Sequence, residues 1–267
     1  MSISETSASW SVPPMPVPRG VDVRTMLAHF AIITYAVDPD VLQSHIHPRF
    51  TVDRITLDDG SERGLVSVVP FLDTDFRFAC FPWKTWTFGQ TNYRAYVTDT
   101  QTGEHVVWFF GTTLGTIYNA VPKHRWKLPW HRGRIVFDCA YDEPHHRFSR
   151  YAMKTESTWA PADVTLKDTG TVVTQDACVF EGFDDFETGF RVLTHPMKGY
   201  FTRRDGRLGT YSIWHDRLTP TVGTVERASF PLLDRLGLVR DGDTSTIHSV
   251  LMQREVEFII HLPPKRA

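Results

Sequence analysis

Short stretches in which apolar and polar residues alternate recur along most of the chain, and this period of two is typical of β-strands. FTVDRITL (50–57) shows a clear alternation, and FAIITYAV (30–37) before it is predicted as a strand because it is apolar and rich in β-branched residues. The same reasoning predicts strands at 64–72, 91–99, 104–111, 133–141, 146–155, 171–180, 198–204, 209–218, 223–230 and 255–262. The Asp-Gly pair in RRDGRL (203–208) predicts a hairpin turn between two of them.

Helical signals are few by comparison. In DPDVLQSHI (38–46), Asp38 is a suitable N-cap and Pro39 suits the first helical position, so we predict a short helix there. Two more helices are predicted at about 114–128 and at 184–194. This excess of strands predicts a mainly β, antiparallel protein. So many strands in one chain also favour a closed or strongly curled sheet, because closure removes open strand edges.

The chain has 267 residues, with no internal repeat and no linker-like stretch after its beginning. We therefore expect a single domain over residues 21–267. Residues 1–20 are rich in Ser and Pro, and we expect them to form an irregular arm that Trp10 holds against the surface.

Composition narrows the range of partners. The balance of charged residues is 29 − 31 = −2, which is too weak a field to indicate nucleic acid or an anionic membrane. Aromatic residues make up 13% of the chain, which favours β-structure or an aromatic-lined pocket. The first 20 residues lack the basic and apolar regions of a signal peptide, and no apolar run approaches the ~20 residues of a membrane span. We expect a soluble, cytoplasmic protein.

The residues that most often bind metals are poorly spaced for it. Cys80, Cys139 and Cys178 lie far apart, so we expect buried free thiols rather than a disulfide framework or a zinc site. His45 and His47 stand where a helix runs into a turn, which points their rings apart, and no third ligand has a suitable spacing. We therefore expect neither a metal nor a cofactor.

The stretch VPKHRWKLPW (121–130) raises a different possibility, because it sets cations among apolar residues. Desolvation lowers the pKa of a lysine, and a neutral amine can form a Schiff base with a carbonyl compound. Lys123 and Lys127 are therefore candidates for a catalytic amine. The alternative is that both are surface charges near a helix end, where they favour the helix dipole.

The stretch ITYAVDPDVLQSHIHPRFTVD (33–53) resembles the opening of the acetoacetate decarboxylase-like superfamily. The later stretches are closer to a bacterial branch of unknown function that lacks the Schiff-base lysine: TNYRAYV (91–97), HVVWFFG (105–111), WKLPWHRGRI (126–135), GYFTRRDGRLGTYSIWHDRL (199–218) and EFIIHLPP (257–264). The resemblance implies a single closed or cone-like antiparallel β-barrel around an internal pocket, with a few short helices.

In the decarboxylases the Schiff-base lysine belongs to an aromatic-Pro-Lys-Lys motif at a helix end. VPKH (121–124) would match it with Lys123 as the amine. LPWH (128–131) is the match that we favour, because the strand GRIVF (133–137) directly follows it, as the motif requires. In that register Trp130 replaces the lysine.

Two other pocket residues of the decarboxylases also lack counterparts. Ala28 and His29 stand where the resemblance implies an arginine, and 91–94 contains no carboxylate where it implies a glutamate. These departures argue against acetoacetate decarboxylase chemistry in this chain.

Alternation on the strand at 91–97 places Asn92, Arg94 and Tyr96 on one face. If that face lines the barrel, a guanidinium lies beside an amide and a phenol, which suits a carboxylate or a polarised carbonyl. If it faces solvent, Tyr93 and Val97 fill the core instead. We take Asn92, Arg94 and Tyr96 as candidate substrate-binding residues.

The segment GTYSIWHD (209–216) carries the candidate proton-transfer groups. His215 could act as a general base if a carboxylate elsewhere pairs with it, and Tyr211 on the same face is a candidate pocket phenol. Trp214, on the other face, is a candidate for substrate contact. His131 and Trp130 occupy the position of the superfamily's motif and are candidates for an acid–base group and a substrate contact.

The stretch DTDFRFACFPWKTWTFG (73–89) is rich in aromatic residues that follow no single period. A pocket rim, a contact between identical chains and the packing of a long loop all remain open for it.

These residues predict an enzyme with an internal apolar pocket that acts on a small molecule bearing a carbonyl or a carboxylate. Isomerisation, cyclisation, dehydration and a lysine-independent lyase step are all compatible with them. The alternatives are a non-catalytic small-molecule-binding protein and a Schiff-base decarboxylase or aldolase that uses Lys123 or Lys127. The expected partner is a small-molecule ligand, and assembly with identical chains is left open.

Overall fold

The structure is a computed structural model that describes residues 11–115 and 127–266. Its helices are α1 (Pro39–Gln43), α3 (Phe186–Thr194) and α4 (Pro231–Arg235). Its strands are β1 (Val23–Val37), β2 (Phe50–Val52), β3 (Arg54–Thr56), β4 (Glu62–Phe78), β5 (Trp86–Asp99), β6 (His105–Leu114), β7 (Trp130–Arg132), β8 (Arg134–Asp142), β9 (Arg147–Glu156), β10 (Ala162–Val172), β11 (Lys198–Thr202), β12 (Leu208–His215), β13 (Thr221–Ser229) and β14 (Ile247–Arg266).

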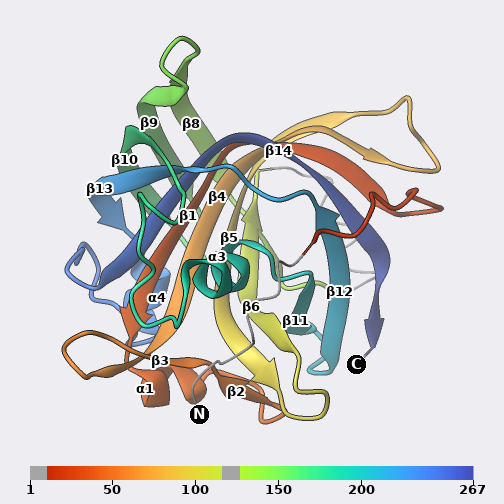
Figure 1. The fold of residues 1–267 in the computed structure, drawn as a ribbon. Helices are drawn as coiled ribbons and strands as arrows, with labels where there is room; N and C mark the ends of the chain where they lie inside the picture. The colour runs from red at the N-terminus through yellow and green to blue at the C-terminus, as the bar shows by residue number, and fades with distance from the viewer. Residues whose placement is uncertain (1–10, 116–126, 267) are drawn as a thin grey trace.

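Seven of these strands close into a ring. The order is β1-β4-β5-β6-β11-β12-β14, and β14 pairs with β1 to complete the circle. The pairings are antiparallel except for β6 with β11, which run parallel. Figure 1 shows these strands curving around a common centre, with α3 in front of β5. The predicted mainly β fold with a closed sheet and a few short helices is confirmed.

The same sheet continues beyond the ring. Strand β14 is long enough to pair with β13 near its beginning, and β13 leads on to β10, β9 and β8. In Figure 1 these strands gather on one side of the ring, beside β1 and β4. Their apolar side chains pack against the outside of the ring, where Tyr151 and Met153 of β9 join Val68 of β4 in one core.

Strand β1 explains why FAIITYAV reads as a nearly continuous apolar run. Alternate residues point to opposite faces, so Ile33 and Tyr35 enter the core outside the ring, while Phe30 and Ile32 enter the core inside it. All four are buried. A strand with both faces covered has no polar face to alternate with.

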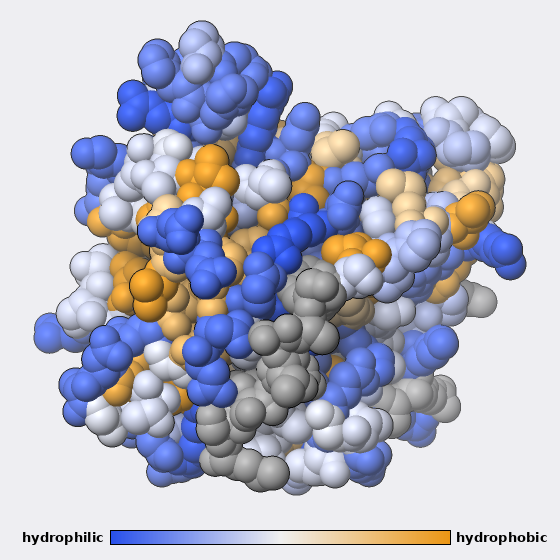
Figure 2. Space-filling model, viewed as in Figure 1, coloured by the Kyte–Doolittle hydropathy of each residue, from blue (hydrophilic) through white to orange (hydrophobic). Residues whose placement is uncertain are grey.

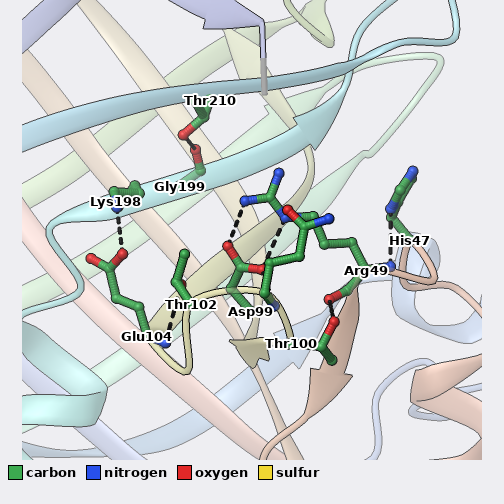
Figure 3. Close-up of polar contacts among 10 residues, drawn as sticks. His47, Arg49, Asp99, Thr100, Thr102, Glu104, Lys198, Gly199 and Thr210 are labelled. Atoms are coloured by element: carbon green, nitrogen blue, oxygen red, sulfur yellow. Dashed lines mark hydrogen bonds and ion pairs between the residues drawn. The ribbon is translucent and has the colours of Figure 1, made fainter.

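One end of the ring is held by ionic contacts between segments far apart in the sequence (Figure 3). Arg49 donates to both carboxylate oxygens of Asp99, at 2.9 and 2.7 Å, and so ties the segment before β2 to the end of β5. Lys198 at the start of β11 pairs with Glu104, which precedes β6. The carbonyl of Gly199 accepts from Thr210 across the β11–β12 pair at 2.9 Å. These contacts hold β11 beside β6 and β12.

Close packing at this join requires a glycine. A Cβ atom on Gly199 would lie 2.3 Å from the ring of Phe109 on β6. The predicted Asp-Gly turn follows, and Gly206 adopts a φ of +77° that favours glycine between β11 and β12.

The predicted helices at 38–46 and 184–194 are present as α1 and α3. Asp38 caps α1 by accepting from the backbone of Asp40 and Val41, with Pro39 in the first turn as expected. Asp185 caps α3 by accepting from the backbone N–H of Thr188 at 2.8 Å. Most of the predicted helix at 114–128 lies outside the described residues, as does Trp10.

The predicted strand at 171–180 is wrong, because only its first two residues belong to β10 and Val179 is 87% exposed. The strand instead begins at Ala162, in a segment where polar residues outnumber apolar ones and weaken the pattern. The short helix α4 was also not predicted. The expectation of buried thiols is wrong for Cys80, which is exposed, while Cys139 and Cys178 are partly buried.

The aromatic stretch at 73–89 forms the end of a hairpin between β4 and β5, in light orange at the upper right of Figure 1. Phe76, Phe78 and Trp86 pack on one another, with ring centroids 5.7 to 6.3 Å apart. At the tip, Phe81 and Trp83 are 53% and 77% exposed. The packing is thus local to the hairpin, and its tip remains open to solvent.

Figure 2 shows that the face seen in Figure 1 carries mostly hydrophilic residues, with apolar residues in scattered groups. Within the described residues, no helix has the length and apolar character that crossing a membrane requires.

Candidate functional site

The interior of the ring contains a cavity of about 70 Å³. Every strand of the ring contributes to its wall, together with the segment that follows α3. The lining residues are Leu27, Phe30, Val69, Phe71, Asp73, Gln90, Asn92, Arg94, Val107, Phe109, Thr194, Pro196, Gly199, Tyr211, Ile213, His215, Phe258 and Ile260. Most are apolar, so the few polar groups among them stand out.

Arg94 is the cation of this cavity and is 8% exposed. Its Nη2 donates to the carbonyl oxygen of Leu193 in α3 at 2.9 Å and lies 3.4 Å from the hydroxyl of Tyr96. Its Nε has no hydrogen-bond partner among the described residues. No carboxylate among the described residues forms an ion pair with the Arg94 guanidinium. A buried guanidinium without a counter-ion favours the binding of an anion.

Asn92 and Gln90 extend the polar stripe along the same face of β5. The side-chain oxygen of Asn92 accepts from the Gln90 amide at 3.0 Å and from the Thr112 hydroxyl at 2.7 Å. These two bonds fix the Asn92 side chain and direct its own NH₂ group away from them. The stripe thus offers amide donors beside the Arg94 guanidinium.

His215 lies on β12 and lines the cavity from another side. Its Nδ1 is 2.7 Å from the carbonyl oxygen of Asp216, a backbone group rather than the carboxylate partner that the sequence suggested. Its ring stacks on Phe258 and meets the edge of His195, with centroids 4.4 Å apart in each case. Burial lowers the pKa of His215 to about 3, with a smaller contribution from His195. The imidazole is therefore neutral at physiological pH.

His195, directly after α3, belongs to a second hollow that the sequence did not reveal. This hollow has a volume of about 310 Å³ and includes Asp53, His105 and Arg191. Burial lowers the pKa of His195 to about 4. Pro196 lines both the hollow and the cavity, so the segment after α3 forms the wall between them.

Asp73 on β4 is the carboxyl group of the cavity and is 1% exposed. One oxygen accepts from the Thr25 hydroxyl at 2.9 Å, and the other has no partner among the described residues. Burial raises the pKa of Asp73 to about 7, and the Thr25 hydrogen bond opposes this shift. Tyr211 also lines the cavity, and burial raises the pKa of its phenol.

The cavity therefore combines one unpaired cation with a carboxyl group and a neutral imidazole. Such a site can bind an anion at Arg94, orient it through amide hydrogen bonds and exchange protons with it through neutral groups. Among residues 11–115 and 127–266, no three His, Cys, Asp or Glu side chains are grouped so that they could hold a metal ion.

Four of the residues proposed from the sequence lie outside the cavity wall. Tyr96 continues the stripe of Arg94, but its hydroxyl bonds to Ser67 and to the carbonyl of Leu193, so it lies behind Arg94. Trp214 faces the other way from His215, because neighbours on a strand point to opposite faces, and its indole donates to the carbonyl of Pro13 at 2.8 Å.

The other two lie on β7. His131 stacks on Trp159 with ring centroids 4.0 Å apart. Trp130 is partly buried against the apolar core inside the ring. Neither of these two side chains belongs to the cavity wall. Strand β7 pairs with β6 but is not one of the seven strands that close around the cavity.

Of the two candidate catalytic lysines, the structure describes only Lys127. Lys123 lies outside the described residues. Lys127 is partly buried, and its carbonyl accepts from the backbone N–H of Arg204 at 2.9 Å. No lysine is among the residues that line the cavity in the described part of the chain.

Sequence reasoning missed Asp73, Gln90 and His195. A signal for two of them was present. Gln90 precedes Asn92 by two residues on the same strand face, and Asp73 continues the alternate positions of Val69 and Phe71. For His195 no pattern was available, because it follows a helix rather than lying on a strand.

Solved structures with a similar fold include enzymes. Acetoacetate decarboxylase from Legionella pneumophila has a TM-score of 0.56 and 14% identity over 98% of each chain. The enduracididine biosynthesis enzyme MppR, in complex with pyruvate, has a TM-score of 0.55 and 14% identity over 98% of this chain and 93% of its own. An acetoacetate decarboxylase-like enzyme from Sphingomonas wittichii has a TM-score of 0.59 and 9% identity over 92% of each chain. At these identities the likeness concerns the fold.

A search of curated proteins returns no match. The model of the DUF2071 family, described as an uncharacterized conserved protein, matches residues 24–257. This match covers the ring apart from the first residue of β1 and the end of β14. The resemblance seen in the sequence is confirmed: the chain belongs to the DUF2071 family and has the fold of the acetoacetate decarboxylase-like proteins.

Proposed function

We propose that this protein is an enzyme that binds a small carboxylate- or carbonyl-bearing molecule inside the ring and rearranges it by proton transfer. Arg94 binds the anionic oxygen, and the amide of Asn92 orients it. The charge of Arg94 helps to lower the pKa of His215, and the two groups face the same cavity. His215 is the neutral group that exchanges a proton with the bound molecule.

One observation carries this proposal: Arg94 is buried in the wall of a cavity, and no carboxylate of the described residues pairs with it. A guanidinium in that position is costly for a protein to keep without a counter-ion. A ligand that supplies the counter-ion accounts for its position.

The size of the cavity supports a small ligand. Its volume of about 70 Å³ is roughly half of the ~150 Å³ apolar cavity that accommodates benzene. We therefore expect a ligand no larger than benzene, with at most about half a dozen non-hydrogen atoms. The pyruvate in the MppR complex is a molecule of this kind, and it is therefore a suitable first probe.

The binding step is tested by isothermal titration calorimetry with pyruvate, acetoacetate and butyrate. Replacing Arg94 by Gln removes a charge-assisted pair worth about 1.5–3 kcal/mol, so affinity should fall at least about tenfold. The matched control is Arg227→Gln on β13, where the arginine is exposed and pairs with Asp163. Equal affinities for wild type and Arg94→Gln would remove Arg94 from the proposal.

The chemical step is tested on each acid that binds, by following its ¹H NMR signals with wild type and with His215→Gln. Conversion by wild type that the variant does not perform supports an enzyme. If wild type binds an acid and leaves every signal unchanged, the protein is a small-molecule-binding protein with the same cavity.

A Schiff base through Lys123 or Lys127 is the competing mechanism. Borohydride reduction in the presence of pyruvate, followed by mass spectrometry, distinguishes it. We expect no adduct on any lysine. An adduct on either residue would replace proton transfer at His215 with amine catalysis.

A further inference from the structure

We propose that the cavity binds a two-ended ligand, whose carboxylate meets Arg94 and whose protonated amine meets Asp73. This inference rests on the proposed function for the Arg94 end and adds a second recognition group at the other end. It narrows the substrate class from small carboxylates to small amino acids with separated charges.

Asp73 has the features of a residue that contacts a ligand. It lies in the cavity wall and is 1% exposed. Its Oδ1 is occupied by the Thr25 hydroxyl, while its Oδ2 is buried and has no partner among the described residues. A buried carboxyl oxygen without a donor is costly, and a cationic donor in the cavity satisfies it.

Arg94 does not serve as that donor. On β4 the partner of Arg94 is Ser67, whereas Asp73 lies further along the strand, opposite Phe88. The Arg94 guanidinium bonds in the direction of Tyr96 and Leu193, away from Asp73. Its charge acts on Tyr211 and His215 but is not among the influences on Asp73. The cation and the carboxyl group thus occupy separate parts of one cavity.

A guanidinium and a carboxyl group that lie apart in one cavity complement a ligand with a negative charge at one end and a positive charge at the other. Apolar side chains such as Val69 and Phe71 line the wall near Asp73, so they suit a short methylene chain between the two charged groups. An amine is favoured over a second carboxylate, because two carboxyl groups facing each other in a buried site repel when ionised. A linear amino acid with its amine at the end of the chain has this arrangement.

The test measures binding, so it does not depend on a reaction. Straight-chain amino acids with three or four carbons and a terminal amine, which have the small size that the cavity allows, are titrated into the protein by calorimetry. Each is compared with the carboxylic acid in which a methyl group replaces the ammonium. At the best chain length, we expect wild type to bind the amino acid at least tenfold more tightly than its methyl counterpart.

Asp73→Asn should remove this preference, so that the amino acid and its methyl counterpart bind the variant with similar affinity. The control Asp163→Asn changes an exposed carboxylate on β10 and should keep the preference. If wild type binds both members of every pair equally, or if Asp73→Asn keeps the tenfold difference, the two-ended ligand is refuted.

The two proposals fail in different ways. If the methyl counterparts bind wild type and need Arg94 but amines give no advantage, only the role of Asp73 falls. If no carboxylate binds with or without an amine, the proposed function falls and the two-ended ligand falls with it.

Discussion

The molecule contains two combinations of an arginine and an aspartate that differ in how they are paired. At one end, in Figure 3, Arg49 and Asp99 form a bidentate ion pair, and the Asp99 side chain is fully buried. In the cavity, Arg94 and Asp73 are both buried, but neither has an ionic partner among the described residues. The same two residue types therefore occur once as a closed pair and once as two open groups.

The protonation of the two carboxyl groups reflects this difference. The hydrogen bonds from Arg49 lower the pKa of Asp99 to about 2, against the effect of burial. Burial without a cation raises the pKa of Asp73 to about 7. A carboxylate that stabilises the fold is supplied with its counter-ion by the chain itself. The cavity instead keeps Arg94 and Asp73 without an ionic partner from the described residues. This lowers the stability of the fold, as is common where binding requires such groups.

The largest expected effect is on stability at alkaline pH after Asp73→Asn. The folded chain holds the Asp73 proton up to about pH 7, whereas the unfolded chain releases it near pH 3.8. Wild type therefore loses stability as pH rises between these values, and the loss is complete above pH 7. Asn does not ionise, so the variant should be more stable at pH 8 by about 4 kcal/mol at most, from about 1.4 kcal/mol per pKa unit.

Urea unfolding at pH 4 and at pH 8 measures this difference. The two proteins should differ little at pH 4, where Asp73 is protonated in the folded chain and only a little over half ionised in the unfolded chain. A constant difference between the two pH values would mean that Asp73 does not hold its proton in the fold.

The opposite change is expected at the closed pair. Asp99→Asn leaves the Arg49 guanidinium without its counter-ion, and its folded-state pKa of about 2 implies a loss of about 2 kcal/mol at pH 7. This stability is present above pH 4 and is lost as pH falls toward 2, so the variant and wild type should converge in acid.

Asp163→Asn is the matched control for that loss. Asp163 also pairs with an arginine, Arg227, but both side chains are exposed to solvent. Exposed pairs contribute about 0–1 kcal/mol, so this variant should unfold close to wild type in urea. If the two variants lose the same free energy of unfolding, burial of the Arg49–Asp99 pair has no special weight.

The sequence was informative about single strands. Alternation placed Asn92 with Arg94 and Tyr211 with His215, and in the structure all four line one cavity. The helix α1 followed from Asp38 and Pro39. The strand β10 was missed although Ala162, Val164 and Leu166 alternate with polar residues, because only these three apolar positions carry the alternation. A short alternation is thus a weaker signal than a long apolar run such as that of β1.

The contacts that define the open and closed charges were beyond such reasoning. Thr25 bonds to Asp73, and Arg49 to Asp99, across about fifty residues in each case. Strand pairing around the ring brings them together, and one sequence does not reveal which strands pair. For the same reason the sequence could not indicate that Asp99 has a cation within reach and that Asp73 has none.

The smallest effect on the free energy of unfolding is expected for Arg94→Met, which is compared directly with Arg49→Met. Arg94→Met removes a cation that no described carboxylate balances, and Tyr96 still donates to the Leu193 carbonyl at 3.2 Å. The free energy of unfolding should therefore stay within about 1 kcal/mol of wild type or rise, as when an apolar residue replaces a buried charge. Arg49→Met is the matched change at the closed pair, and it should cost about 2 kcal/mol or more because it leaves Asp99 buried and unpaired. Equal losses in urea unfolding would show that Arg94 stabilises the fold as Arg49 does, and the contrast between open and closed charges would no longer hold.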